Sequence, residues 1–241
     1  MSALLLDEDY HVHSTFSDDA RSTVRDNVLA GENAGLSIMC LVDHVRRDTT
    51  YVPQLVETVR ALRPSTMVHL LIGVEAKILN ASGELDAPRD LDGVDHVLIA
   101  DHQFPSNEGP LSPSEVRRRL DAGELSRSEA LETLLIATAR AVENTERPVV
   151  AHFLSLLPKI GLDEMDLDGA LVEHVARRFR RAGALVEVNE KWGCPGALTL
   201  SILSRVGVSL VAGSDAHHCS DVGRYHKVRE LADSSCALVR A

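Results

Sequence analysis

Eight histidine and acidic residues of this 241-residue sequence share one kind of position, at or just after the end of a short apolar run. They are His11, His13, His44, Glu75, His102, His152, Asp215 and His217. Imidazole and carboxylate groups together are ligands of Zn, Mn and Fe, and they do not decide among these metals. Grouped ions of this kind activate water and clamp the oxygens of an ester. The set therefore indicates a metal-dependent hydrolase.

Each of these motifs alone has an ordinary structural explanation. The two-residue period of a strand would put His11 and His13 on one face without any ligand, and Glu75 or Asp215 could cap a helix. Together these explanations must place several imidazoles and carboxylates in one crevice without a counter-ion. Such burial is costly unless the groups are paired or bind metal. A shared metal site is the better interpretation.

Short apolar runs alternate with segments of helical period along the chain. Most runs are continuous stretches of Val, Ile and Leu, which is typical of strands covered on both faces. The predicted strands are Asp9–His13, Leu36–Val42, Val68–Val74, His96–Ala100, Pro148–Ala151, Ala184–Val188 and Val208–Ala212. The predicted helices are Ser22–Ala34, Val52–Leu62, Ser112–Asp121, Ser126–Glu143, Leu167–Ala182 and Gly196–Val206.

This alternation predicts an α/β fold in which a parallel sheet has helices outside it. Seven strand–helix units in this length fit a barrel, and an open doubly wound sheet is an alternative that periodicity does not exclude. In both folds the carboxyl ends of the strands converge on one face, where active sites are built. The eight residues are therefore expected to meet in space. The length suits one large domain or two small ones, and we expect a single domain spanning residues 1–241.

Composition narrows the classes of function. No apolar run approaches the roughly 20 residues of a membrane span, and Met1–Tyr10 lacks the pattern of a secretory signal, so a cytoplasmic location is expected. The formal net charge of −11 disfavours general nucleic-acid binding. Bound metal ions would still attract an anionic substrate. The four cysteines are scattered without a CxxC pair, which argues against a disulfide framework.

Four motifs, in order along the chain, resemble those of the PHP family, named for its polymerase and histidinol phosphatase members. They are His11-Val12-His13, Leu41-Val42-Asp43-His44, Gly73-Val74-Glu75 and Ser214-Asp215-Ala216-His217. The segment Asp221-Val222-Gly223 that follows resembles the segment found at this position in histidinol-phosphatase-like members of the family. No single motif is specific, but the ordered set covers essentially the whole chain. The resemblance implies a distorted (β/α)7 barrel with two or three divalent ions (Zn, Mn or Fe) at its carboxyl-terminal face.

The resemblance also implies which residues hold each ion, with Glu75 bridging two of them. The three ligand sets are His11, His13, Glu75 and Asp215; Glu75, His102 and His152; and His44, His217 and either Asp18 or Asp19. The family's spacing permits either aspartate in the third set. The residues before His102 depart from the usual family pattern.

The implied reaction is hydrolysis of a small-molecule phosphate monoester by metal-bound hydroxide. Asp215 or a nearby histidine such as His217 would relay protons. Cations at the same face are expected to contact the phosphate, and Trp192 is expected to line the pocket. The candidate cations are Arg46, Lys77, Lys191 and Arg224.

Two other functions stay open at this point. The same ligands would serve a phosphodiester, a nucleotide or a C–N bond, because specificity depends on the loops. A non-catalytic PHP domain is the third possibility, and the complete ligand set argues against it. The sequence does not predict the substrate, the metal or the oligomeric state.

Overall fold

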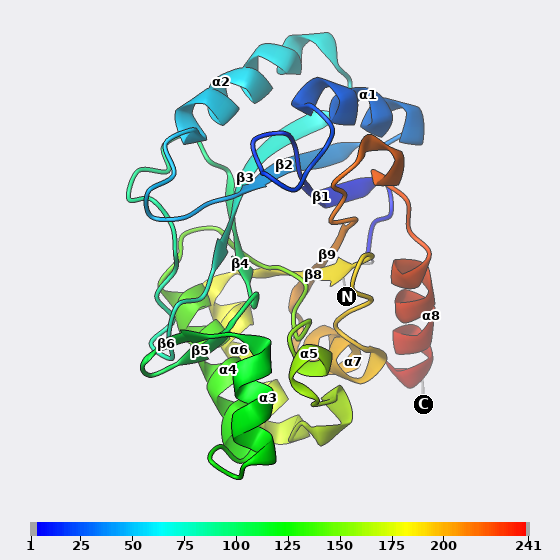
Figure 1. The fold of residues 1–241 in the computed structure, drawn as a ribbon. Helices are drawn as coiled ribbons and strands as arrows, with labels where there is room; N and C mark the ends of the chain where they lie inside the picture. The colour runs from blue at the N-terminus through cyan, green and yellow to red at the C-terminus, as the bar shows by residue number, and fades with distance from the viewer. Residues whose placement is uncertain (1–3, 240–241) are drawn as a thin grey trace.

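Seven parallel strands form a nearly closed barrel in the computed structural model, which describes residues 4–239 (Figure 1). The strands are β1 (Glu8–Val12), β2 (Ile38–His44), β3 (His69–Lys77), β4 (His96–Ala100), β7 (Pro148–Val150), β8 (Leu185–Asn189) and β9 (Ser209–Gly213). Their order in space, β1-β2-β3-β4-β7-β8-β9, follows their order in the chain. A doubly wound sheet would reverse this order at a switch point. The predicted barrel is therefore confirmed, and the open sheet is excluded.

The barrel closes between β1 and the segment that follows β9. The backbone N–H of His13 donates to the carbonyl of Ala216 at 2.9 Å, and the N–H of Ala216 donates to the carbonyl of His11 at 3.3 Å. On its other side β1 pairs with β2, and the register shifts by one residue between Asp9 and Val12. Such bulges bend a strand and redirect its side chains. The distortion of the barrel thus lies beside two of the predicted ligands.

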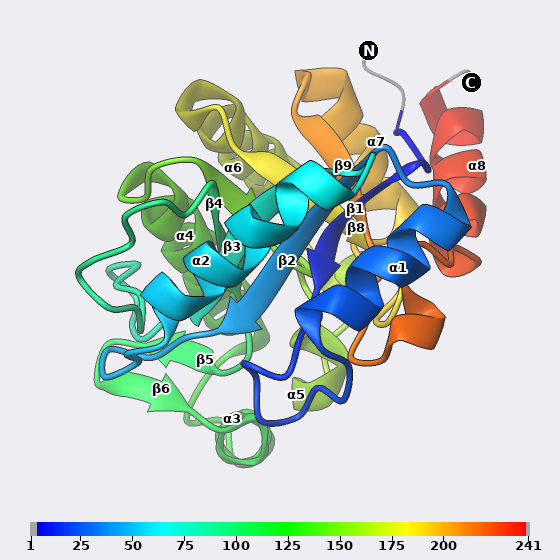
Figure 2. The same ribbon diagram turned by 90° about the horizontal axis from the view of Figure 1, so that it is seen from above.

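Helices surround the barrel (Figures 1 and 2). The α-helices are α1 (Val24–Ala34), α2 (Val52–Leu62), α3 (Pro113–Asp121), α4 (Arg127–Glu143), α5 (Leu157–Ile160), α6 (Gly169–Ala182), α7 (Ala197–Val206) and α8 (Lys227–Val239). Short 3-10 helices are η1 (Arg63–Ser65), η2 (Glu164–Asp166) and η3 (Cys219–Asp221). Both views place α1 and α2 outside β1–β3, while α4, α6 and α7 cover the opposite side.

Local sequence signals explain why the helices begin and end where they do. Thr23 caps α1 by accepting a hydrogen bond from the N–H of Asp26, whose carboxylate in turn accepts from the N–H of Thr23. The helix ends at Gly35, which adopts the left-handed conformation with φ 74°. The hairpin of β5 (Phe104–Ser106) and β6 (Gly109–Leu111), together with α5 and α8, was not among the predicted elements.

The inside of the barrel is filled by small and medium apolar side chains. Buried members are Cys40, Val42, Leu98, Val149, Ala151 and Val211. Space is so limited that a Cβ added to Gly73 would lie 2.8 Å from Cγ2 of Val42. The barrel is therefore a packed core, and polar side chains gather where the strands end.

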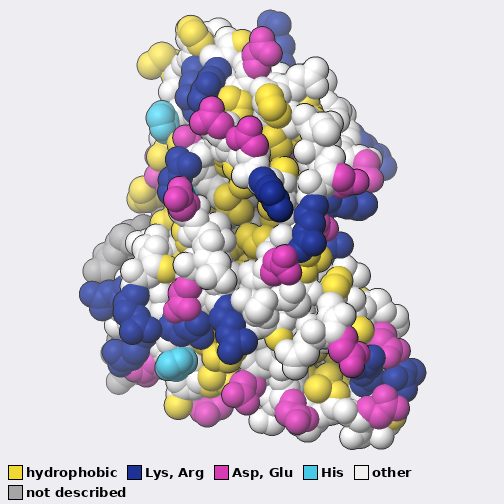
Figure 3. All heavy atoms as spheres, turned by 90° about the vertical axis from the view of Figure 1, so that its left-hand side faces the viewer, with side chains coloured by type: hydrophobic (Ala, Val, Ile, Leu, Met, Phe, Trp, Pro, Cys, Tyr) yellow, Lys and Arg dark blue, Asp and Glu magenta, His cyan; other side chains and the backbone are white. Residues whose placement is uncertain are grey.

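The outer surface mixes charges of both signs. Figure 3 shows both acidic and basic side chains on the face that it presents, with several basic ones gathered at the lower left. That face as a whole is not uniformly basic, as a surface that binds nucleic acid would be. Within residues 4–239, no helix combines the length and the apolar character needed to span a membrane.

Candidate metal centre

The carboxyl ends of the strands bring the eight predicted residues together, as expected. His11 lies in β1, His44 closes β2 and Glu75 lies in β3, while the others follow β1, β4, β7 and β9. Five of the eight side chains are buried: His11, His13, Glu75, His152 and Asp215. The remaining three, His44, His102 and His217, are partly exposed. The group thus has a buried base and a rim that solvent reaches.

Glu75 is the centre of this group, because its carboxylate contacts five imidazoles. Oε1 lies 2.8 Å from Nε2 of His152 and 3.2 Å from Nε2 of His102. Oε2 lies 2.8 Å from Nδ1 of His44 and 3.5 Å from Nε2 of His11. The fifth imidazole, that of His13, is also 3.5 Å from Oε2. Although Nδ1 of His44 lies at 2.8 Å, no contact of Oε2 within the described residues has the geometry of a hydrogen bond, and this oxygen is buried. A buried oxygen of this kind is costly, and a cation would satisfy it.

A second observation fits a cation at the same place. Nε2 of His11 lies 2.9 Å from Nε2 of His13, so that two imidazole nitrogens point at one another. Burial lowers the pKa of His13 to about 3, which leaves it neutral. Burial also lowers the pKa of His11, but Glu187 and Glu75 outweigh it and hold that pKa well above its usual value. Positive charge is therefore favoured between the two rings, and a divalent ion would supply it.

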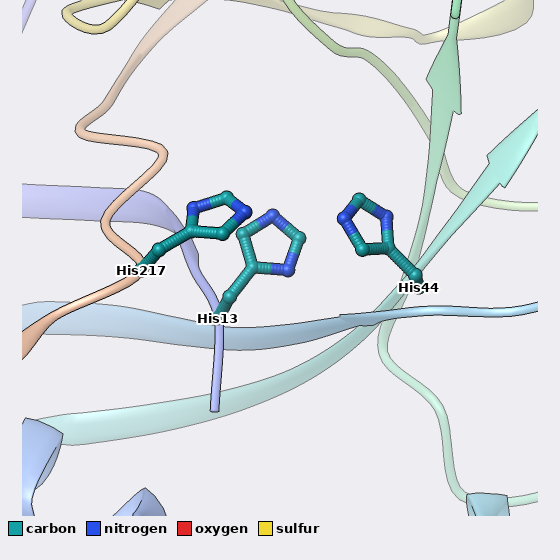
Figure 4. A group of neighbouring side chains, drawn as sticks. All are labelled: His13, His44 and His217. Carbon is teal, nitrogen blue, oxygen red and sulfur yellow. The ribbon is translucent and has the colours of Figure 1, made fainter. Parts of the chain in front are cut away.

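A further group of side chains connects the buried base to the rim, and Figure 4 shows its three histidines. The rings of His13, His44 and His217 come from three different strand ends and face one another (Figure 4). Oδ2 of Asp19 lies 3.2 Å from Nε2 of His217 and 3.5 Å from Nε2 of His44. Asp18 lines the same cavity. Among the described residues it is Asp19, rather than Asp18, that contacts these histidines, so geometry favours Asp19 as the acidic ligand.

Three groups of potential ligand atoms each lie within 4.8 Å of one another. They are His11, His13 and Glu75; His44, Glu75 and His102; and His13, His44 and His217. The first agrees with the first ligand set that the family resemblance implies. The other two groups differ from the implied sets. In one of them His44 lies with Glu75, and in the other it lies with His13, although the resemblance assigns His44 to a different ion from both. Neighbouring ions would thus lie close enough to share ligands.

Two of the clustered residues have unusual backbone conformations. His152 has φ 29° and Asp215 has φ 54°, in the left-handed region that residues with a Cβ seldom adopt. Such conformations persist only where the surroundings fix them, and they concentrate at functional sites. The N–H of His152 donates to Glu187 at 2.6 Å, which holds one of them in place.

A cavity of about 490 Å³ opens over the cluster, and three of the predicted cations line it: Arg46, Lys77 and Lys191. Nζ of Lys191 lies 3.3 Å from Oδ1 of Asp215 and 3.2 Å from Nδ1 of His217. Lys77 pairs with Asp86 at 3.5 Å. Arg224 instead lines an adjoining cavity of about 370 Å³ that shares Lys191 and Asp215 with the first.

Trp192 also lines the main cavity, as expected. Its indole N–H donates to Oδ2 of Asp215 at 3.0 Å. The side chain thereby joins the wall of the cavity to one of the clustered carboxylates.

The sequence analysis missed two buried carboxylates that support the cluster. Asp101 lies 3.1 Å from Nδ1 of His152 and accepts a hydrogen bond from the hydroxyl of Ser155 at 2.7 Å. Glu187 lies 3.0 Å from Nδ1 of His11. Both acids stand inside or directly after continuous apolar runs. A charged residue in such a run is the signal that could have identified them, because its burial requires a partner.

The fold and this cluster define a metal-dependent hydrolase. Residues 9–191 match the PHP domain family, and because the match spans most of the chain, the protein belongs to the PHP family. The last motif, with Asp215 and His217, lies beyond the matched residues. In the folded chain it nevertheless lies next to the other clustered residues, with Asp215 in contact with His13.

Known proteins similar to this chain agree with the assignment. A probable phosphatase of Vibrio vulnificus is 27% identical over 94% of this chain and 84% of its own length. A probable phosphatase of Caldanaerobacter subterraneus is 25% identical over 93% and 82%. Among solved structures, histidinol phosphate phosphatase of Lactococcus lactis, complexed with zinc, L-histidinol and phosphate, has a TM-score of 0.62 at 17% identity. It covers 97% of this chain and 92% of its own, and it shows the same fold.

Proposed function

We propose that this protein hydrolyses a phosphate monoester of a small molecule at a centre of two or three divalent ions. The observation that carries the proposal is the cluster around Glu75 beneath a cavity lined by cations. The family, and relatives that are named as probable phosphatases, support this class of reaction. The volume of about 490 Å³ suits a small substrate.

The chain offers ligands for each ion. In the proposed arrangement Glu75 is shared between two sets, and Asp19 serves the third. The sets are His11, His13, Glu75 and Asp215; Glu75, His102 and His152; and His44, His217 and Asp19. When bound, such ions lower the pKa of a water molecule to roughly 7 and neutralise charge on phosphoryl oxygens. Mixed imidazole and carboxylate ligation suits Zn, Mn or Fe.

The other residues of the cavity bind the substrate and handle protons. Lys191, next to Asp215, would donate hydrogen bonds to phosphoryl oxygens. Arg46 and Lys77 line the same cavity and would interact with the remaining charge of the phosphate. Asp215 receives the indole N–H of Trp192 and lines the cavity, so it is placed to relay a proton.

A panel of substrates tests this function. The protein, loaded in turn with Zn²⁺, Mn²⁺ or Fe²⁺, is assayed with an aryl phosphate, a bis-aryl phosphodiester and common phosphorylated metabolites. We expect phosphate release from monoesters, at a kcat/KM higher than that for the diester. No phosphate release from any monoester would refute the proposal. Faster turnover of the diester would instead favour a phosphodiesterase.

Replacing Lys191 with methionine tests the role of this cation. The substitution keeps a long apolar side chain and removes the charge that lies beside Asp215 and His217. We expect KM for the phosphate ester to rise about 10- to 100-fold, because a hydrogen bond to a charged group contributes about 1.5–3 kcal/mol. Metal content should stay at the wild-type value, which serves as the internal control. An unchanged KM would remove Lys191 from the substrate site.

A further inference from the structure

Glu187 is a buried carboxylate beneath the cluster, and none of the proposed ligand sets includes it. It lies in β8 between Val186 and Val188, and its exposed fraction is 0%. Taking a carboxylate fully out of water costs several kcal/mol unless its oxygens find donors. The partners of Glu187 therefore have to account for its presence in the core.

Both oxygens of Glu187 accept hydrogen bonds. Oε1 lies 3.0 Å from Nδ1 of His11 and 2.9 Å from the side-chain nitrogen of Asn189. Oε2 accepts the backbone N–H of His152 at 2.6 Å. A carboxylate can only accept, so Nδ1 of His11 has to carry the hydrogen in this contact.

The neighbouring strand leaves room for this carboxylate. A Cβ built on Gly213 in β9 would lie 1.9 Å from Oε1 of Glu187 and 2.7 Å from Cδ. Real side chains essentially never approach so closely. The missing side chain at position 213 therefore creates the space in which Glu187 reaches His11.

The contact with His11 decides which ring nitrogen faces the cluster. With the hydrogen fixed on Nδ1, the lone pair of a neutral His11 is on Nε2. Nε2 is the atom that lies 3.5 Å from Glu75 and 2.9 Å from His13. Second partners of this kind orient a ligating histidine and make it a stronger base.

The contact with His152 acts through the backbone. Oε2 holds the N–H of a residue whose φ is 29°, a conformation that needs external support. The ring of this same residue reaches Oε1 of Glu75 at 2.8 Å through Nε2. One carboxylate thus fixes two histidines that belong to different ligand sets.

We propose that Glu187 is a positioning residue that orients His11 and His152 together, so that it determines the affinity of two neighbouring ions. Gly213 contributes to the same positioning role, because its lack of a side chain provides the space for the carboxylate of Glu187. The inference rests on the metal centre of the proposed function and on no step of the hydrolysis.

The substitution Glu187→Gln tests the inference, because it keeps the size of the side chain. Donors approach both oxygens of Glu187, whereas a glutamine offers one oxygen and one NH₂ group. In either orientation the NH₂ group meets a donor, or it forces the hydrogen of His11 onto Nε2. We expect zinc affinity, measured by competition with a chromogenic chelator, to fall about 10- to 100-fold. The loss should affect two ions, and Mn²⁺ should show the same trend.

Glu164→Gln is the matched control. Glu164 is partly buried and accepts a backbone N–H, that of Gly196 at 2.6 Å, and a side-chain donor, the hydroxyl of Thr199 at 2.7 Å. Neither donor belongs to the cluster. We expect this variant to lose thermal stability in the metal-free state while its zinc affinity stays within twofold of wild type.

Gly213→Ala is a second test that leaves Glu187 itself unchanged. The added Cβ displaces the carboxylate, so zinc affinity should fall in the same direction as in Glu187→Gln. Zinc affinity within twofold of wild type in both variants, or an equal loss in Glu164→Gln, would overturn the inference.

These outcomes separate the inference from the proposed function. A wild-type protein that binds no divalent ion overturns both. A wild-type protein that binds zinc but hydrolyses no monoester refutes the proposed function. Weakened zinc binding in Glu187→Gln would still support the positioning role in that case.

Discussion

Replacing His13 with alanine should abolish turnover and reduce the metal content. His13 is fully buried and belongs to two of the three groups of clustered ligand atoms. Its Nε2 lies 3.5 Å from Glu75 and 3.5 Å from Asp215, so its loss disrupts the base of the centre. We expect kcat/KM to fall by about 10³-fold or more, since activation of water near neutral pH depends on the ions. Steady-state kinetics and elemental analysis of the same sample measure both effects.

The control for this variant is His174→Ala. His174 lies at an exposed position of α6 and belongs to none of the groups of clustered ligand atoms. Its replacement should leave activity and metal content unchanged. If His13→Ala kept wild-type activity with a full complement of metal, the centre would lie elsewhere.

Replacing Glu75 with glutamine should have an effect of similar size for a different reason. The substitution keeps the shape of the side chain but removes the charge that five histidines surround. Because Glu75 is shared between two ligand sets, more than one ion should be weakened. We expect a loss of about 10³-fold in kcat/KM, together with lower metal content after dialysis.

Glu57→Gln provides the comparison at an exposed glutamate of α2. This variant should behave as wild type in both measurements. Retention of all bound metal and of activity in Glu75→Gln would show that this carboxylate does not hold the ions.

The fold could be predicted from the sequence because each βα unit carries local signals. Val52–Leu62 repeats apolar residues at helical spacing, and the helix has these bounds in the structure. Gly35 ends α1 as expected. The β5–β6 hairpin gave no such signal, since its strands have three residues each and both contain a proline.

The cluster could be predicted for a topological reason. Parallel strands direct their carboxyl ends to one face. The positions of His11 and His152 at strand ends were therefore sufficient to predict that the two side chains lie close together. What the strand positions could not provide was the choice between Asp18 and Asp19, because both lie in one loop. Which of the two contacts His44 depends on the path of that loop in space, and in the structure it is Asp19.

The supporting carboxylates required the structure. Glu187 belongs to an apolar strand in the sequence, and 176 positions separate it from its partner His11. No local period indicates that contact, which depends on the strand order of the barrel. For the same reason, the position of Arg224 after the last strand could be predicted from the sequence. That its side chain lines the adjoining cavity rather than the main one could not.

The most direct test of a metal-dependent hydrolase is metal analysis of the purified protein before and after chelation. We predict two or three equivalents of transition metal, and removal by a chelator should lower the melting temperature and abolish phosphate release. Activity should return when Zn²⁺, Mn²⁺ or Fe²⁺ is added back. Fewer than one equivalent of transition metal in the reconstituted protein, with no change of melting temperature on chelation, would contradict this account.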